Sequence, residues 1–242
     1  MKLDILVLAA HPDDAELSCS GTLLAHIALG KKVGIIDFTQ GEMGTRGSAE
    51  IRKQEAEASS KILGVHIREN LQFADAFFKN DREHQLEVIK VIRKYRPEIV
   101  LANAPQDRHP DHPKAAALSV EACFYSGLKK LSTQLNGQAQ EAWRPKKVYH
   151  FIQSDYIEPD FSVDITPYWD KKVESIKAFA TQFHTGSAED KTAQDSTFIS
   201  TPEFMHFIES RARHWAKPLG VKYAEGFVKT QPIGVKDLFD LL

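Results

Sequence analysis

The feature that most constrains the fold of this chain is a regular alternation of apolar runs and amphipathic stretches over about its first 150 residues. Apolar runs typical of buried strands cover residues 3–10, 31–39, 65–73, 98–103 and 146–153. Stretches with apolar residues at helical spacing lie between them, at 15–30, 47–64, 82–96 and 112–127. This order predicts an α/β fold, a Rossmann-like, doubly wound and mostly parallel sheet with helices on both faces.

The remainder of the chain has a different pattern, which predicts a C-terminal α/β extension. We expect short strands at 160–166 and 221–229, amphipathic helices at 168–183 and 202–216, and a polar, mobile loop at 185–200. No clear linker separates this part from the rest. We therefore treat residues 1–242 as a single domain, with a core at 1–153 and an extension at 154–242 that packs on it.

Composition and charge exclude several classes of protein. The chain is 42% hydrophobic and 26% charged, so it can bury a full core, and its net charge of −2 argues against nucleic-acid or membrane partners. Cys19 and Cys123 form no CxxC pattern, which suits a reducing compartment. The first apolar run is too short for a signal peptide or a membrane span. We expect a cytoplasmic protein.

Three polar, turn-rich segments follow predicted strands. "HPDD" follows the first strand, "TQGEMGTRG" the second, and "NAPQDRHPDHP" the strand at 98–103. In open α/β sheets, ligands bind beyond the carboxyl ends of the strands, so these segments should share one edge of the sheet.

Two adjacent carboxylates at the edge of a core need a compensating positive charge. His11 and Asp14 are three residues apart, as are His109 and His112. One histidine and one carboxylate from the first segment, plus one histidine from the later one, would make a catalytic zinc site with a position left for water. Such an ion would lower the pKa of its bound water to about 7.

Two alternatives to a metal site stay open for these segments. Either "HPDD" or "HPDH" alone is more often a turn with an aspartate N-cap. Dinucleotide binding is weakly supported, because no GxGxxG follows any strand and the first turn carries acids where a pyrophosphate would need bare amides.

The combined motifs resemble a known family. "AAHPDD", "GEMGTRG" and "HPDH", with "RKQEAEASSKILG" and "KYAEGFV", resemble the LmbE-like (PIG-L) zinc-dependent N-deacetylases, which remove acetyl groups from N-acetylglucosamine conjugates. The length of the chain and its C-terminal part are most similar to those of the family branch that acts on N-acetylglucosaminyl-malate in bacillithiol biosynthesis. The resemblance implies a metal-dependent amide hydrolase with one Zn²⁺ per chain, a small amino-sugar conjugate as substrate, and a homo-oligomer.

The resemblance also implies roles for the residues of the first segment. His11, Asp14 and His112 would bind zinc, and Asp13 would remain free as the general base. This division is chemically reasonable, because a carboxylate beside the metal can accept a proton from water and return it to the leaving amine. Iron(II) or cobalt would fit the same ligands.

Two further residues of the later segment acquire catalytic roles by resemblance. His109, as an imidazolium, would stabilise the oxyanion or donate a proton; whether it or Asp13 protonates the amine stays open. Asp111 would orient His109, since a carboxylate behind a histidine fixes its tautomer. The alternative for Asp111 is a helix N-cap.

Candidate substrate contacts are Glu42 for sugar hydroxyls, Arg46 and Arg52 for an anion, and Arg108 for a substrate carboxylate. Arg52 stands at the start of a predicted helix, where a cation is disfavoured, which suggests a functional role. Its alternative is a simple ion pair with an acid such as Glu55.

Two other functions fit the same motifs. One is a deacetylase of another N-acetylglucosamine conjugate or of a chitooligosaccharide. The other is a metal-dependent sugar-binding module without activity. A free Asp13 favours an enzyme, because a binding module needs the metal ligands but has no use for a base beside them.

Overall fold

The computed structural model describes residues 1–184 and 197–241, and it contains a seven-stranded sheet. The strands are β1 (Ile5–Ala9), β2 (Val33–Thr39), β3 (Ile67–Phe73), β4 (Ile99–Ala102), β7 (Lys147–Phe151), β8 (Phe161–Asp164) and β9 (Ala224–Lys229). Their order is β3-β2-β1-β4-β7-β9-β8. The first five are parallel, whereas β9 runs antiparallel to β7 and β8. The predicted mostly parallel α/β sheet is confirmed.

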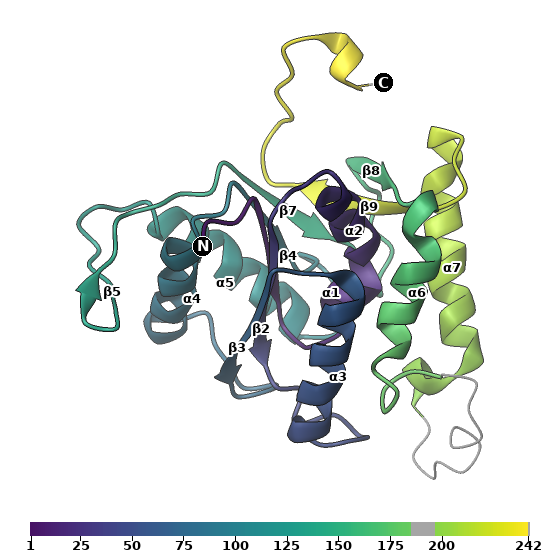
Figure 1. Cartoon of the computed structure of the whole chain (residues 1–242), viewed down its shortest axis with the longest axis horizontal. Coiled ribbons are helices and arrows are strands. Elements are labelled where there is room, and N and C mark those ends of the chain that lie inside the picture. Colours follow the sequence, from purple (N-terminus) through teal and green to yellow (C-terminus); the bar gives the residue numbers. More distant parts are fainter. Residues whose placement is uncertain (185–196, 242) are drawn as a thin grey trace.

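Helices cover both faces of this sheet (Figure 1). They are α1 (Asp14–Ser18), α2 (Ser20–Ala28), α3 (Ala49–Leu63), α4 (Arg82–Tyr95), α5 (Asp111–Tyr125), α6 (Trp169–Lys177) and α7 (Pro202–Ala216), with 3₁₀ turns η1 (Thr166–Tyr168), η3 (Phe198–Ser200), η4 (Lys217–Leu219) and η5 (Leu238–Leu241). Helices α4 and α5 lie on one side, and the others on the opposite side. No helix in the described ranges is long and apolar enough to cross a membrane.

The period-two alternation of side chains in β1 explains why both faces need cover. Leu6 and Leu8 belong to the core beneath α4 and α5, whereas Ile5, Val7 and Ala9 belong to the core on the opposite face. All five are buried. A strand buried on both faces reads as a continuous apolar run, which is the pattern that the sequence shows.

The C-terminal part completes the same sheet. Strand β9 pairs with β7, and β8 pairs with β9. Helix α6 ends at Lys177, earlier than expected, and is followed by a turn that buries Phe179 and Phe183 in a third core with α7. Of the loop expected at 185–200, residues 185–196 lie outside the described part of the chain.

The helix expected at 15–30 is broken at Cys19 into α1 and α2. A buried ion pair occupies the break: Lys172 Nζ lies 2.8 Å from Glu225 Oε1 and donates to the carbonyl of Glu16, near the end of α1. The Glu225 carboxylate accepts from backbone N–H groups in the first turn of α2, among them that of Gly21. The ion pair thus provides hydrogen-bond partners for backbone groups at the end of α1 and the start of α2. In a continuous helix these groups would bond to one another. A small hairpin, β5 (Gln134–Leu135) and β6 (Gln138–Ala139), was also not expected.

The strand order places a switch point at β1. From β1 the chain continues to β2 on one side, and β4 lies on the other. The loops after β1 and β4 therefore meet at the carboxyl edge of the sheet, where a crevice for ligands forms in such folds.

Candidate metal and catalytic site

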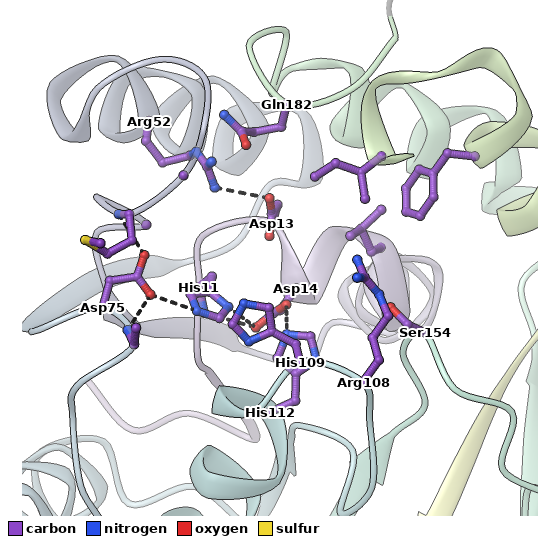
Figure 2. A pocket seen from close by; sticks show the side chains of 17 residues that line it. His11, Asp13, Asp14, Arg52, Asp75, Arg108, His109, His112, Ser154 and Gln182 are labelled. Atoms are coloured by element: carbon purple, nitrogen blue, oxygen red, sulfur yellow. Dashed lines mark hydrogen bonds and ion pairs between the residues drawn. The ribbon is translucent and has the colours of Figure 1, made fainter. Parts of the chain in front are cut away.

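The loop after β1 turns its two aspartates in different directions (Figure 2). Asp14 is the first residue of α1 and faces His112, whereas Asp13 faces Arg52. Asp13 has a φ of 122°, a region that favours glycine. Such strain costs about 1–3 kcal/mol and is typical of functional sites.

His11, Asp14 and His112 converge as a ligand set would. His11 Nδ1 lies 3.6 Å from Asp14 Oδ2, and His112 Nε2 lies 3.3 Å from Asp14 Oδ1. Ligand atoms bound at about 2.0–2.1 Å in a tetrahedron are roughly 3.3 Å apart, so the spacing fits a zinc-sized cation. All three residues are buried, with 9%, 3% and 7% of their surface exposed.

The electrostatics of this cluster favour a cation. Although burial lowers it, the pKa of His112 is raised to about 9 by Asp14 and by a hydrogen bond to Asp107. The pKa of His11 is likewise raised, against burial, by the carboxylates of Asp111, Asp14 and Asp75. Carboxylates that draw protons onto two buried imidazoles would equally attract a divalent metal.

The three histidines form a second possible ligand set. One ring nitrogen each from His11, His109 and His112 can be chosen within 4.8 Å of one another. The His109 ring stacks on that of His112, with centroids 4.9 Å apart. Asp14 has the shorter contacts and the buried charge, which favour the predicted set of His11, Asp14 and His112.

A layer of three carboxylates supports the histidines, and the sequence analysis missed two of them, Asp75 and Asp107. His112 Nδ1 lies 2.9 Å from Asp107 Oδ1, and His11 Nε2 lies 3.1 Å from Asp75 Oδ1 and 3.3 Å from Asp111 Oδ2. Carboxylates in this position fix the tautomer of a metal-binding histidine and raise its basicity. In the neutral rings, His112 Nε2 and His11 Nδ1 are then the nitrogens whose lone pairs can bind a metal.

Asp13 has the environment of a general base. Its side chain is buried, and Arg52 Nη1 lies 3.1 Å from its Oδ2. Burial raises the pKa of Asp13 to about 7, although the positive charge of Arg52 opposes this. A carboxylate that titrates near neutral pH can both accept and return a proton.

Arg52 lines the cavity but differs from the expected substrate contact. It is 5% exposed and donates to the carbonyl of Pro12 and to Asp13, while Glu55 lies 3.9 Å from its Nε. Its guanidinium is therefore occupied by the loop after β1. The structure therefore favours the alternative role of Arg52, an ion pair with a nearby acid, and its principal partner is Asp13.

His109 and Asp111 do not form the predicted pair of side chains. The Asp111 carboxylate accepts from Ala76 N and Lys114 Nζ and contacts His11, while its backbone N–H donates to His109 Nδ1 at 3.3 Å. This bond leaves the proton of neutral His109 on Nε2. Burial, followed by the nearby His11 and His112, lowers the pKa of His109, so the ring is a neutral donor and not the expected imidazolium.

The remaining predicted substrate contacts separate into two groups. Arg108 is exposed, lines the cavity and lies 6.0 Å from the Phe198 ring. Glu42 and Arg46 are not among the residues that line it. The Glu42 carboxylate accepts from Asp75 N, which joins the loop after β2 to the loop after β3, and the carbonyl of Arg46 accepts from the Gln182 side chain.

The C-terminal extension provides one wall of the cavity. Gln182, Ile199 and Phe204 line it together with the metal-ligand candidates, and so do Ser154 and Met43. An apolar wall beside a polar floor suits a small ligand with one reactive polar group.

Four supporting residues escaped the sequence analysis: Asp75, Asn103, Asp107 and Gln153. Asn103 and Gln153 donate to the Asp14 carboxylate at 2.9 and 2.8 Å. A signal was available, because each of the four follows a strand at the same edge of the sheet. They carry no motif that separates them from ordinary loop residues.

Comparisons with known proteins agree with this site. A family model described as PIG-L: GlcNAc-PI de-N-acetylase matches residues 6–123, a range that contains all three metal-ligand candidates. The crystal structure of the conserved protein TT1542 from Thermus thermophilus superposes with a TM-score of 0.85 at 34% identity, covering 98% of each chain.

Three curated relatives of this chain are named for two kinds of reaction, deacetylation and hydration. Diacetylchitobiose deacetylase of Thermococcus kodakarensis is 29% identical over 92% of this chain and 81% of its own length. Probable N-acetyl-alpha-D-glucosaminyl L-malate deacetylase 2 of Bacillus anthracis is 24% identical over 88% and 95%. The 4-oxalmesaconate hydratase of Pseudomonas putida is 27% identical over 74% of each.

Proposed function

Because this chain belongs to the PIG-L family of GlcNAc-PI de-N-acetylases, we propose that it is a zinc-dependent hydrolase that removes the N-acetyl group from an N-acetylglucosamine conjugate. The products are acetate and the free amine. The observation that carries this proposal is the division between Asp14, which faces the histidines, and Asp13, which faces away from them.

A divalent metal held by His11, Asp14 and His112 would polarise the amide carbonyl and lower the pKa of water. Asp13 takes the proton from the attacking water, and its pKa near 7 lets it return that proton to the leaving amine. His109 offers a neutral Nε2–H to the oxyanion that develops on the carbonyl oxygen.

The finer substrate proposal is N-acetylglucosaminyl-malate, as in bacillithiol biosynthesis. Arg108 supports it, because its guanidinium is exposed at the cavity and pairs with no carboxylate in the described ranges. The planar guanidinium of an arginine can donate two parallel hydrogen bonds to a carboxylate, which suits a dicarboxylate such as malate. The alternative substrate is a chitooligosaccharide, for which this anchor has no use. We also propose a cytoplasmic homo-oligomer.

Release of acetate from three substrates tests the proposal. N-acetylglucosaminyl-malate should react faster than diacetylchitobiose and N-acetylglucosamine, and Arg108→Met should raise KM for the malate conjugate alone. Acetate is the product to follow, because one relative is named for a hydration and not for a deacetylation. Equal rates on all three substrates would refute the malate assignment, and no acetate from any would refute the enzyme.

The variant Asp13→Ala distinguishes an enzyme from a sugar-binding module without activity. If the chain is an enzyme, this variant keeps the metal and loses about 10²–10⁴-fold in kcat. In a binding module the substitution would change neither metal content nor sugar affinity.

A further inference from the structure

Two buried carboxamides contact the Asp14 carboxylate and are not among the residues that line the cavity. Asn103 follows β4, and Gln153 comes two residues after β7. The two strands are parallel neighbours, with Ala102 opposite His150, so both side chains reach the same edge of the sheet. Asn103 is 0% and Gln153 5% exposed. No role in the proposed reaction uses either of them.

Backbone donors fix how each carboxamide is oriented. Asn103 Oδ1 accepts from Ala10 N at 2.8 Å, and Gln153 Oε1 accepts from Ala104 N at 3.1 Å. A backbone N–H can only donate, so each amide must present its NH₂ in the opposite direction, toward Asp14. Neither group can be flipped without leaving a buried donor unpaired.

The NH₂ of Asn103 is fully used. One hydrogen goes to Asp14 Oδ2 at 2.9 Å and the other to Gln153 Oε1 at 2.9 Å. Asp14 Oδ2 also accepts from His11 N at 2.9 Å. Oδ2 thus accepts two hydrogen bonds, whereas Oδ1 accepts one, from Gln153.

The NH₂ of Gln153 lies between two metal-ligand candidates. It donates to Asp14 Oδ1 at 2.8 Å and lies 3.2 Å from His112 Nε2. Because His112 Nδ1 is 2.9 Å from Asp107, the proton of the neutral ring belongs on Nδ1. In this neutral form of the ring, which is the form that can bind a metal, Nε2 accepts the second hydrogen of Gln153.

We propose that Gln153 is the positioning residue of the metal site, held by Asn103, and that its amide keeps the ligand atoms in place before the metal arrives. This rests on the proposed function only in assuming that the ligands are His11, Asp14 and His112. On metal binding, Gln153 would release His112 Nε2 and could keep its bond to Asp14 Oδ1. Because Oδ2 accepts two hydrogen bonds and Oδ1 one, Oδ1 is the oxygen of Asp14 that is more open to a metal.

Removal of the amide tests this directly. Gln153→Leu keeps the size and loses both donors, so Zn²⁺ affinity should fall about 10–100-fold, as for other partners of metal ligands. Affinity is measured on chelator-stripped protein by competition with a chromophoric chelator. The matched control is Gln85→Leu. The NH₂ of Gln85, on α4, likewise makes two side-chain contacts, to Asn80 Oδ1 and to the carboxylate of Glu121 on α5, so this variant loses comparable bonds away from the site and zinc affinity should not change.

A second variant covers the case in which Gln153→Leu fails to fold. Gln153→Glu keeps the shape but places a carboxylate against Asp14 Oδ1 and His112 Nε2. The metal-free protein should unfold at a lower temperature than wild type, and Zn²⁺ should raise its Tm by more than it raises that of wild type. In a purely structural role the Zn²⁺-induced rise would be equal in both.

The outcomes separate this inference from the proposed function. If wild type binds no Zn²⁺, the proposed function fails. If wild type binds Zn²⁺ and Gln153→Leu binds it equally well, with an equal Tm rise in Gln153→Glu, only the role of Gln153 is overturned.

Discussion

Arg52 Nη1 lies 3.1 Å from Oδ2 of Asp13, and both side chains are buried. The arginine starts from the first turns of α3, and the aspartate from the loop after β1. The guanidinium thereby holds the proposed base at the cavity while the metal-ligand candidates lie on the other side of the loop (Figure 2).

The first prediction is that Arg52 acts through Asp13 and not on the substrate. Arg52→Met should lower kcat about 10²-fold, because the base loses its anchor. In an Asp13→Asn background the same substitution should add little. A further rise in KM in the double variant would instead mean that Arg52 binds the substrate. Steady-state acetate release measures all three variants.

The strained backbone at Asp13 leads to a second prediction. Asp13→Gly relieves the positive φ at the cost of about 0.5–1 kcal/mol in chain entropy, whereas Asp13→Ala keeps the strain. We expect the glycine variant to be more stable than the alanine variant by about 1 kcal/mol in urea unfolding, with both inactive. Greater stability of the alanine variant would contradict this account.

The two ligand sets that share His11 and His112, one with Asp14 and one with His109, make opposite predictions for metal content. Asp14→Asn should lose the metal, and His109→Gln should retain about one per chain while losing activity. Elemental analysis after dialysis against dilute zinc measures both variants. The reverse result would support the set of three histidines.

The break between α1 and α2 leads to a fourth prediction. Lys172→Met leaves Glu225 buried without its partner and should cost about 3–5 kcal/mol in the free energy of unfolding. Lys172→Met combined with Glu225→Gln should recover part of this loss. Urea unfolding of metal-free protein measures the double-mutant cycle, and simple additivity of the two substitutions would argue against a coupled pair.

Much of this fold could be predicted from the sequence because its signals are local. Apolar runs and helical spacing gave the parallel sheet and most helix positions, and the resemblance to the LmbE-like deacetylases is confirmed by the family match. The break at Cys19 could not be predicted, since its cause, the pair of Lys172 and Glu225, comes from more than a hundred residues downstream.

The sequence by itself determined which residues follow which strand, and thus that His11, Asp14 and His112 would reach one edge of the sheet. Only the tertiary structure decided their partners. The Asp111 carboxylate contacts His11 instead of His109, Arg52 donates to Asp13, and Gln153 donates to Asp14. Hydrogen-bond partners depend on side-chain directions at the meeting of distant loops, and residue spacing along the chain does not encode those directions.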